Sequence, residues 1–105
     1  MATVRALNDA FRTSGQGGRI VATRGVQEKG AGFVAQALER VQIFAAFTQD
    51  NDPYGEHDFG SFELDGEKLY WKIDCYDKEM RYGSEDPSDP EKTTRVLTIL
   101  LAEEY

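Results

Sequence analysis

A turn signal between two alternating segments constrains the fold most strongly. Asp65-Gly66 separates FGSFEL (59–64) from EKLYWKIDCY (67–76), and apolar and polar residues alternate on both sides of it. Asp-Gly is favoured in two-residue hairpin turns because both positions tolerate the positive φ angles that such turns require. The sequence therefore predicts an antiparallel hairpin over residues 59–76, in which Leu64 faces Glu67 and Gly60 faces Trp71.

The alternation divides the hairpin side chains between two faces of the predicted sheet. The face that we expect to pack on helices carries Phe62, Leu64, Leu69, Trp71, Ile73 and Cys75. The opposite face carries Ser61, Glu63, Lys68, Tyr70, Lys72 and Asp74. In this register Glu63 lies opposite Lys68, and such a cross-strand charge pair contributes from a few tenths to about 1 kcal/mol.

The N-terminal segment predicts a helix over residues 3–13. Val4, Leu7 and Phe11 share one helical face there, and the glycine-rich residues 14–18 end the segment. This glycine cluster follows a predicted helix rather than a strand, and no Lys-Ser/Thr pair follows it. A flexible turn is therefore favoured over a phosphate-binding loop.

Residues 19–25 are rich in β-branched side chains and predict a strand. Residues 32–47 predict a helix, because apolar residues recur at helical spacing at Val34, Leu38, Val41 and Ala45. The end of this segment, VQIFAAF, is also compatible with an extended conformation.

The C-terminal segment fits two structures. Asp89 is typical of a helix N-cap and Pro90 of the first helical position, which predicts a helix over residues 90–103. The rival prediction is a strand through residues 94–101, where Thr94, Val96, Thr98 and Leu100 alternate with other residues. The cap chemistry favours the helix.

These elements predict one α+β domain spanning residues 1–105. Its small antiparallel sheet consists of the strand at 19–25 and the hairpin at 59–76, and helices at 3–13, 32–47 and 90–103 pack on one face. With 105 residues, the chain has the length of one domain, and it contains no apolar run of bilayer length. The N-terminus lacks a secretory pattern, and the lone Cys75 cannot form an internal disulfide, so we expect a cytoplasmic protein.

The formal net charge of −7 is distributed unevenly along the chain. Residues 1–49 hold six Lys/Arg and three acids, whereas residues 50–105 hold six Lys/Arg and sixteen acids. The acidic half disfavours direct nucleic-acid binding and favours a protein partner with a basic surface. Solubility alone would also account for such a charge.

Four blocks of the C-terminal half resemble one family. They are NDPYGEHDFG (51–60), WKIDCYD (71–77), GSEDPSDP (83–90) and RVLTILLAEEY (95–105). The chain thereby resembles a small bacterial domain-of-unknown-function family that is often found on mobile elements such as plasmids. The resemblance implies no activity. Cys75 stands where the family pattern leads us to expect an aromatic residue, which argues against a redox or nucleophilic role for it.

The only histidine, His57, lies in an acidic segment and is the centre of the candidate site. Extending the hairpin register beyond Gly60 places His57 opposite Asp74, on the face opposite Trp71. A histidine that is held by a carboxylate is a plausible general base, and Glu56 is a third catalytic candidate. Asp52, His57 and Asp58 are weak metal candidates, because their spacing matches neither a calcium loop nor a zinc motif. We expect no cofactor.

The same segment also has a purely structural interpretation. Asn51 and Asp52 can hydrogen-bond the backbone in Asx turns, Gly55 allows a positive φ angle, and His57 can bond a neighbouring carboxylate.

Three functions are compatible with the sequence. The first is a non-enzymatic binding or regulatory protein, such as a mobile-element inhibitor that mimics nucleic-acid charge; its binding residues would be Asp50, Asp52, Glu56, Asp58, Glu85, Asp86 and Asp89. The second is a metal- or histidine-dependent hydrolase that uses His57, Asp74 and Glu56. The third is an oligomer-forming module with the second hairpin strand as an exposed edge.

Overall fold

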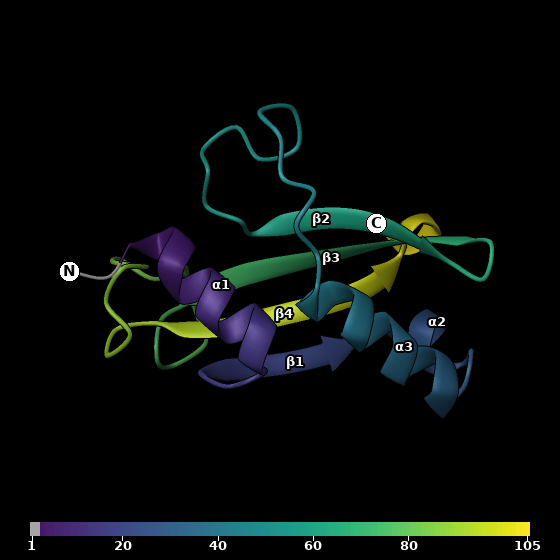
Figure 1. Ribbon diagram of the computed structural model, residues 1–105. Helices are drawn as coiled ribbons and strands as arrows, with labels where there is room; N and C mark the ends of the chain where they lie inside the picture. The colour runs from purple at the N-terminus through teal and green to yellow at the C-terminus, as the bar shows by residue number, and fades with distance from the viewer. Residues whose placement is uncertain (1–2) are drawn as a thin grey trace.

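The computed structural model describes residues 3–105 and arranges them around one four-stranded sheet (Figure 1). The strands are β1 (Gly18–Ala22), β2 (Phe59–Leu64), β3 (Glu67–Tyr76) and β4 (Thr94–Leu101), in the order β1-β4-β3-β2. β1 runs parallel to β4, whereas the β4–β3 and β3–β2 pairs are antiparallel. The fold is therefore α+β as predicted, but its sheet is mixed rather than antiparallel.

The predicted hairpin is confirmed residue by residue. The pairing runs from Phe59 opposite Lys72 to Leu64 opposite Glu67, and the turn residues Asp65 and Gly66 have φ angles of 52° and 79°. Glu63 and Lys68 lie opposite each other but form no ion pair. The Lys68 ammonium instead lies 5.4 Å from the centroid of the Tyr70 ring.

The predicted helix over residues 90–103 is wrong, because residues 94–101 form β4. The cap chemistry is present but produces only a single turn, in which Asp89 Oδ1 accepts the N–H of Glu91. β4 lies between β1 and β3, so both of its edges are hydrogen-bonded, and Leu97, Ile99 and Leu101 are buried on the helix-covered face. Pairing on both sides outweighs a local cap, which the sequence could not reveal. The rival strand prediction is correct.

β3 is also an interior strand, so the predicted exposed edge at the second hairpin strand is wrong. Within residues 3–105, the two edge strands of the sheet are β1 and β2.

Three α-helices cover one face of the sheet (Figure 1): α1 (Val4–Ser14), α2 (Arg24–Gln27) and α3 (Ala31–Gln42). α1 matches the helix predicted at 3–13. The predicted strand at 19–25 ends at Ala22, where the chain turns into α2, and a short 3₁₀ helix, η1 (Ala102–Glu104), follows β4. None of the helices within residues 3–105 combines the length and apolarity needed to span a bilayer.

The helix predicted at 32–47 ends five residues early, at Gln42. The guanidinium of Arg12, which is 4 % exposed, donates to the carbonyls of Val41, Gln42 and Phe44 and thereby terminates α3. A cation at this position also interacts favourably with the helix dipole. The residues that follow are not helical, but the extended alternative for VQIFAAF (41–47) is not confirmed either, because Val41 and Gln42 belong to α3, Ile43 keeps a helical conformation and residues 44–47 form no strand.

The core lies between the helices and one sheet face. Phe11, Val26, Phe33, Ala37 and Val41 of the helices pack against the inward side chains of β2, β3 and β4, with Trp71 fully buried at the centre. No α-helix of the described part of the chain covers the opposite face, where the rings of Phe59, Tyr70 and Tyr105 contact one another.

Candidate functional site

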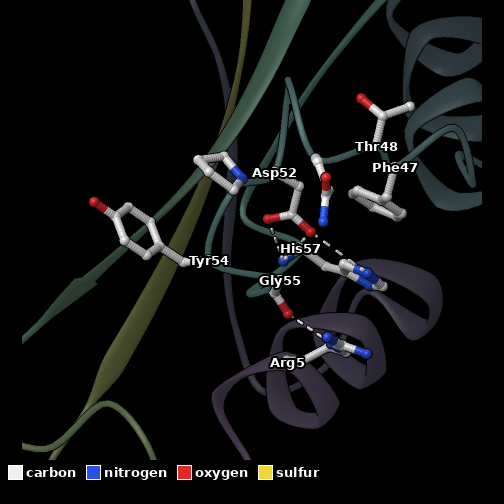
Figure 2. Close-up of a pocket in the computed structure, with 9 residues that line it drawn as sticks. Arg5, Phe47, Thr48, Asp52, Tyr54, Gly55 and His57 are labelled. Atoms are coloured by element: carbon white, nitrogen blue, oxygen red, sulfur yellow. Dashed lines mark hydrogen bonds and ion pairs between the residues drawn. The ribbon is translucent and has the colours of Figure 1, made fainter.

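The segment from 43 to 58 connects α3 to β2 and forms a concavity against α1. The concavity has a volume of about 390 Å³ and is lined by Arg5 of α1, residues 47–49, residues 52–55 and His57 (Figure 2). It contains the only histidine of the chain and is the site that the sequence singled out.

Asp52 holds this loop in shape. Its carboxylate is nearly buried, and Oδ1 accepts the N–H groups of Glu56 (3.1 Å) and His57 (3.2 Å). Asn51 acts similarly, because its side chain accepts the N–H of Thr48 and donates to the carbonyl of Ala46. Both side chains therefore organise the backbone, as the structural interpretation predicted, although their bonds reach further than an Asx turn does.

Gly55 allows α1 to approach the loop. Its φ angle of 65° is confirmed as positive, and its carbonyl accepts a 2.6 Å bond from Nε of Arg5 (Figure 2). A Cβ atom at this position would lie 2.5 Å from Nη2 of Arg5. The backbone conformation therefore favours glycine here, whereas the exposed end of the Arg5 side chain could shift to accommodate a Cβ atom.

His57 is held between two carboxylates. Its Nδ1 lies 2.9 Å from Oδ1 of Asp9, and its Nε2 lies 3.5 Å from Oδ2 of Asp52. The imidazole stacks on the Phe47 ring, with centroids 3.8 Å apart and planes 3° apart. Since both ring nitrogens face acids and one ring face is covered, little of the imidazole is directed into the concavity.

The predicted pairing of His57 with Asp74 is wrong. The hairpin ladder continues as far as Asp58, whose carbonyl accepts the N–H of Ile73 at 2.8 Å. His57 then adopts a φ angle of 53°, which turns the chain out of the ladder and places the ring beside Phe47 on the Trp71 side. Asp74 forms an ion pair with Lys72 (3.0 Å) on the opposite face.

The other candidates near His57 point elsewhere. Glu56 contributes backbone atoms, since its carbonyl accepts a 2.9 Å bond from Nδ2 of Asn8. The three proposed catalytic residues, His57, Asp74 and Glu56, therefore do not converge on one point.

Asp58, a weak metal candidate, has a raised pKa. Burial raises the pKa of its carboxyl, and the neighbouring carboxylates of Asp52 and Asp74 raise it further.

The described His, Asp, Glu and Cys side chains form neither a metal centre nor a reactive thiol. Within residues 3–105, no group of three or more His, Cys, Asp or Glu side chains is arranged to hold a metal ion. Burial raises the pKa of Cys75, which keeps its thiol protonated and weakly nucleophilic.

The remaining acidic candidates lie on the segment between β3 and β4. Glu85 forms an ion pair with Lys92 at 3.7 Å. Asp86 accepts the hydroxyl and the N–H of Ser88, and these bonds lower the pKa of its carboxyl. Asp89 accepts the N–H of Glu91, and Asp50 is exposed at the loop beside His57.

The structure brings the two acidic segments, 50–58 and 77–92, to the same end of the sheet (Figure 1). Asn8 of α1 donates to the Glu56 carbonyl and accepts a 2.7 Å bond from Nε of Arg95, and Arg95 in turn donates to the Pro87 carbonyl. We call this region, consisting of residues 50–58 and 77–92, the acidic end.

Sequence reasoning missed the residues of α1 that complete this region. Asp9 holds His57, while Asn8 and Arg12 are 1 % and 4 % exposed. A signal was available, because Asn8 and Arg12 lie four residues apart and flank Phe11 on the predicted apolar face. Polar residues on such a face need partners from elsewhere in the fold.

The chain belongs to a family of proteins of unknown function, DUF3768, whose model matches residues 22–104. No curated protein and no solved structure matches the chain.

Proposed function

We propose that this protein is a non-enzymatic binding protein whose acidic end engages a basic surface of a partner protein. One observation carries the proposal: residues 50–58 hold four acids without any Lys or Arg, and residues 77–92 hold six acids and three Lys/Arg. These two segments together account for the entire net charge of −7, so the rest of the chain is neutral on balance. A solubility requirement alone would not concentrate the charge at one end, whereas a field that steers a basic partner requires such concentration.

Exposed aromatic and apolar side chains within the acidic end also support binding. Tyr54 is 86 % exposed, Tyr82 is 74 % exposed and Met80 is 37 % exposed. Tyr and Met are enriched at protein–protein interfaces, where they serve as anchors inside a polar rim. The acidic end therefore combines long-range attraction with groups that can be buried on contact.

We further propose that the partner is a nucleic-acid-binding protein and that the acidic end occupies its nucleic-acid site. The acidic end repels nucleic acid itself, but carboxylates along an exposed surface can pair with the Lys and Arg residues that bind phosphates. The family that the sequence blocks resemble is often carried on mobile elements, and an inhibitor of a host nuclease in the cytoplasm suits that setting.

Two variants with the same change in net charge test the proposal. The first, the acidic-end variant, combines Asp50→Asn, Glu79→Gln and Glu91→Gln, and the second, the control variant, combines Glu39→Gln, Glu63→Gln and Glu103→Gln. All six positions are exposed. Each protein is immobilised, bacterial lysate is applied over a salt series, and every retained protein is then purified and assayed for competition with DNA.

We expect wild type and the control variant to retain a basic, DNA-displaceable partner, and the acidic-end variant to lose it. Retention should also vanish near 1 M salt, where the Debye length falls to about 3 Å. Equal retention by both variants, or retention that salt does not weaken, would contradict the proposal.

A hydrolase centred on His57 and Asp74 stays a prediction with weaker support. Both nitrogens of His57 face carboxylates, and Asp74 pairs with Lys72 instead.

A further inference from the structure

Arg95 is a buried cation without a carboxylate partner. Its side chain is 3 % exposed and extends from β4 beneath α1. Among residues 3–105, its hydrogen-bond acceptors are Oδ1 of Asn8 and the carbonyl of Pro87, which are both neutral. Nη1 has no protein acceptor there and is not fully buried, so it is the part of the guanidinium that is open to a ligand or to solvent. Burying a charge without an opposite charge is unfavourable, even when some of its hydrogen bonds are satisfied.

The other buried arginine shows how the fold compensates such a charge elsewhere. Arg12 is 4 % exposed, and its guanidinium lies 3.2 Å from a carboxylate oxygen of Asp9 and against the C-terminus of α3. Arg12 therefore has both a counter-charge and a helix dipole, and Arg95 has neither. Among the described residues, Arg95 is therefore the buried arginine that has no carboxylate in direct contact.

A cavity of about 140 Å³ lies beside Arg95. α1 contributes Leu7, Ala10 and Phe11 to its wall, the turn at residues 16–17 closes one side, and Pro90, Thr93 and Arg95 complete the lining. Five of the eight lining residues are apolar or glycine, and Arg95 is the one charged residue among them. The cavity is distinct from the concavity at His57 and shares no residue with it.

We propose that this cavity binds a small carboxylate that carries a short apolar group. The carboxylate would pair with Nη1 of Arg95, because Nε and Nη2 already donate to Asn8 and Pro87, and a charge-assisted bond of this kind is stronger than a neutral one. The side-chain amide of Gln16 on the cavity wall supplies a further donor. The apolar body of the ligand would lie against Leu7, Ala10 and Phe11, where a fully hydrated phosphate would have few polar partners.

The proposal is tested with three probes: butyrate, its neutral analogue butyramide, and inorganic phosphate. Each is titrated into the full chain at constant ionic strength while amide NMR shifts and the unfolding temperature are recorded. We expect butyrate alone to shift the amides of residues 7–17 and 91–95 saturably and to raise the unfolding temperature, because a ligand that binds only the folded state stabilises it.

Two matched variants show whether the cavity itself is responsible. Ala10→Phe places a ring at the cavity wall, whereas Ala6→Phe places the same ring on an exposed position of α1 outside the cavity. We expect the first variant to lose at least tenfold in butyrate affinity and the second to bind like wild type. Both positions are exposed on one helix, so both proteins should fold.

Arg95→Met removes the positive charge but keeps an apolar side chain at the cavity wall. This variant should therefore lose the preference for butyrate over butyramide. Butyramide binding as tightly as butyrate, phosphate binding at least as tightly, or Ala10→Phe leaving the affinity unchanged would each overturn the proposal. The outcome of these tests does not depend on whether the acidic end binds a basic partner, since none of the probes is a basic macromolecule.

Discussion

Two glycines with opposite surroundings show how closely individual residues are constrained. Gly60 faces Trp71 in the core, and a Cβ atom there would lie 2.5 Å from Nε1 of Trp71 and 2.7 Å from the Phe44 ring. Gly32 lies in α3 with open space around it and an ordinary φ angle. The hairpin register by itself predicts that Gly60 lies opposite Trp71. It does not predict the contact with the Phe44 ring, because Phe44 lies in the segment that follows α3.

We therefore expect Gly60→Ala to lower the free energy of unfolding by about 1–3 kcal/mol, because a buried ring must move. Gly32→Ala should raise it by about 0.5–1 kcal/mol, since alanine restricts the unfolded chain and favours the helix. Urea unfolding of both variants measures the two changes. A Gly60→Ala protein as stable as wild type would show that the core is looser than the contacts indicate.

The raised pKa of Asp58 leads to a pH-dependent prediction. A carboxyl whose folded pKa lies above its unfolded value of 3.8 stabilises the fold in acid, and this contribution is lost as the pH rises through the folded pKa. Asp58→Asn should therefore be more stable than wild type at neutral pH, by less than about 1 kcal/mol because much of the side chain stays in water. The difference should vanish at pH values below the unfolded pKa.

The free energy of unfolding of wild type and of Asp58→Asn, measured from neutral pH down to a pH below the unfolded pKa, tests this prediction. A variant that is less stable than wild type at neutral pH would mean that the charged carboxylate makes a favourable contact.

At the scale of elements, side chains from one helix determine where another ends. Arg12 of α1 donates to the last carbonyls of α3, those of Val41 and Gln42, and its guanidinium lies 5.3 Å from the Trp71 ring centroid and 5.4 Å from that of Phe47. The sequence predicted α1 well because its apolar spacing is local. It predicted the end of α3 poorly because the group that ends that helix lies about thirty residues away.

Replacement of this guanidinium should be costly. We expect Arg12→Met to lower the free energy of unfolding by about 2–4 kcal/mol, because buried carbonyls of α3 lose their donors. Arg5→Met, in the same helix, removes a partly solvated bond to Gly55 and should cost less than about 1 kcal/mol. Thermal unfolding of the two variants distinguishes the roles, and equal losses would show that α3 does not depend on Arg12.

At the scale of the whole molecule, charge is segregated from the core. The acidic end carries the net charge, while the helix-covered sheet face carries the apolar cluster. Like charges that are crowded at one end repel one another in the folded state, and this repulsion is screened by salt.

The unfolding temperature of wild type should accordingly rise as salt is added from low concentration. The variant with Asp50→Asn, Glu79→Gln and Glu91→Gln should show a smaller rise than the variant with Glu39→Gln, Glu63→Gln and Glu103→Gln. Calorimetry over a salt series measures both slopes, and equal slopes would mean that repulsion is not concentrated at the acidic end.

The sequence by itself determined the hairpin, its register and the division of its side chains, because a two-residue turn and period-two alternation are local properties. It also determined α1 and the acidic composition of residues 50–58 and 77–92. Only the tertiary structure decided that residues 94–101 form a strand, since pairing with β1 and β3 outweighs the local cap at Asp89. It likewise decided that His57 meets Asp9 and Asp52 rather than Asp74, because one positive φ angle turns the chain out of the ladder and toward a helix that lies distant in the sequence.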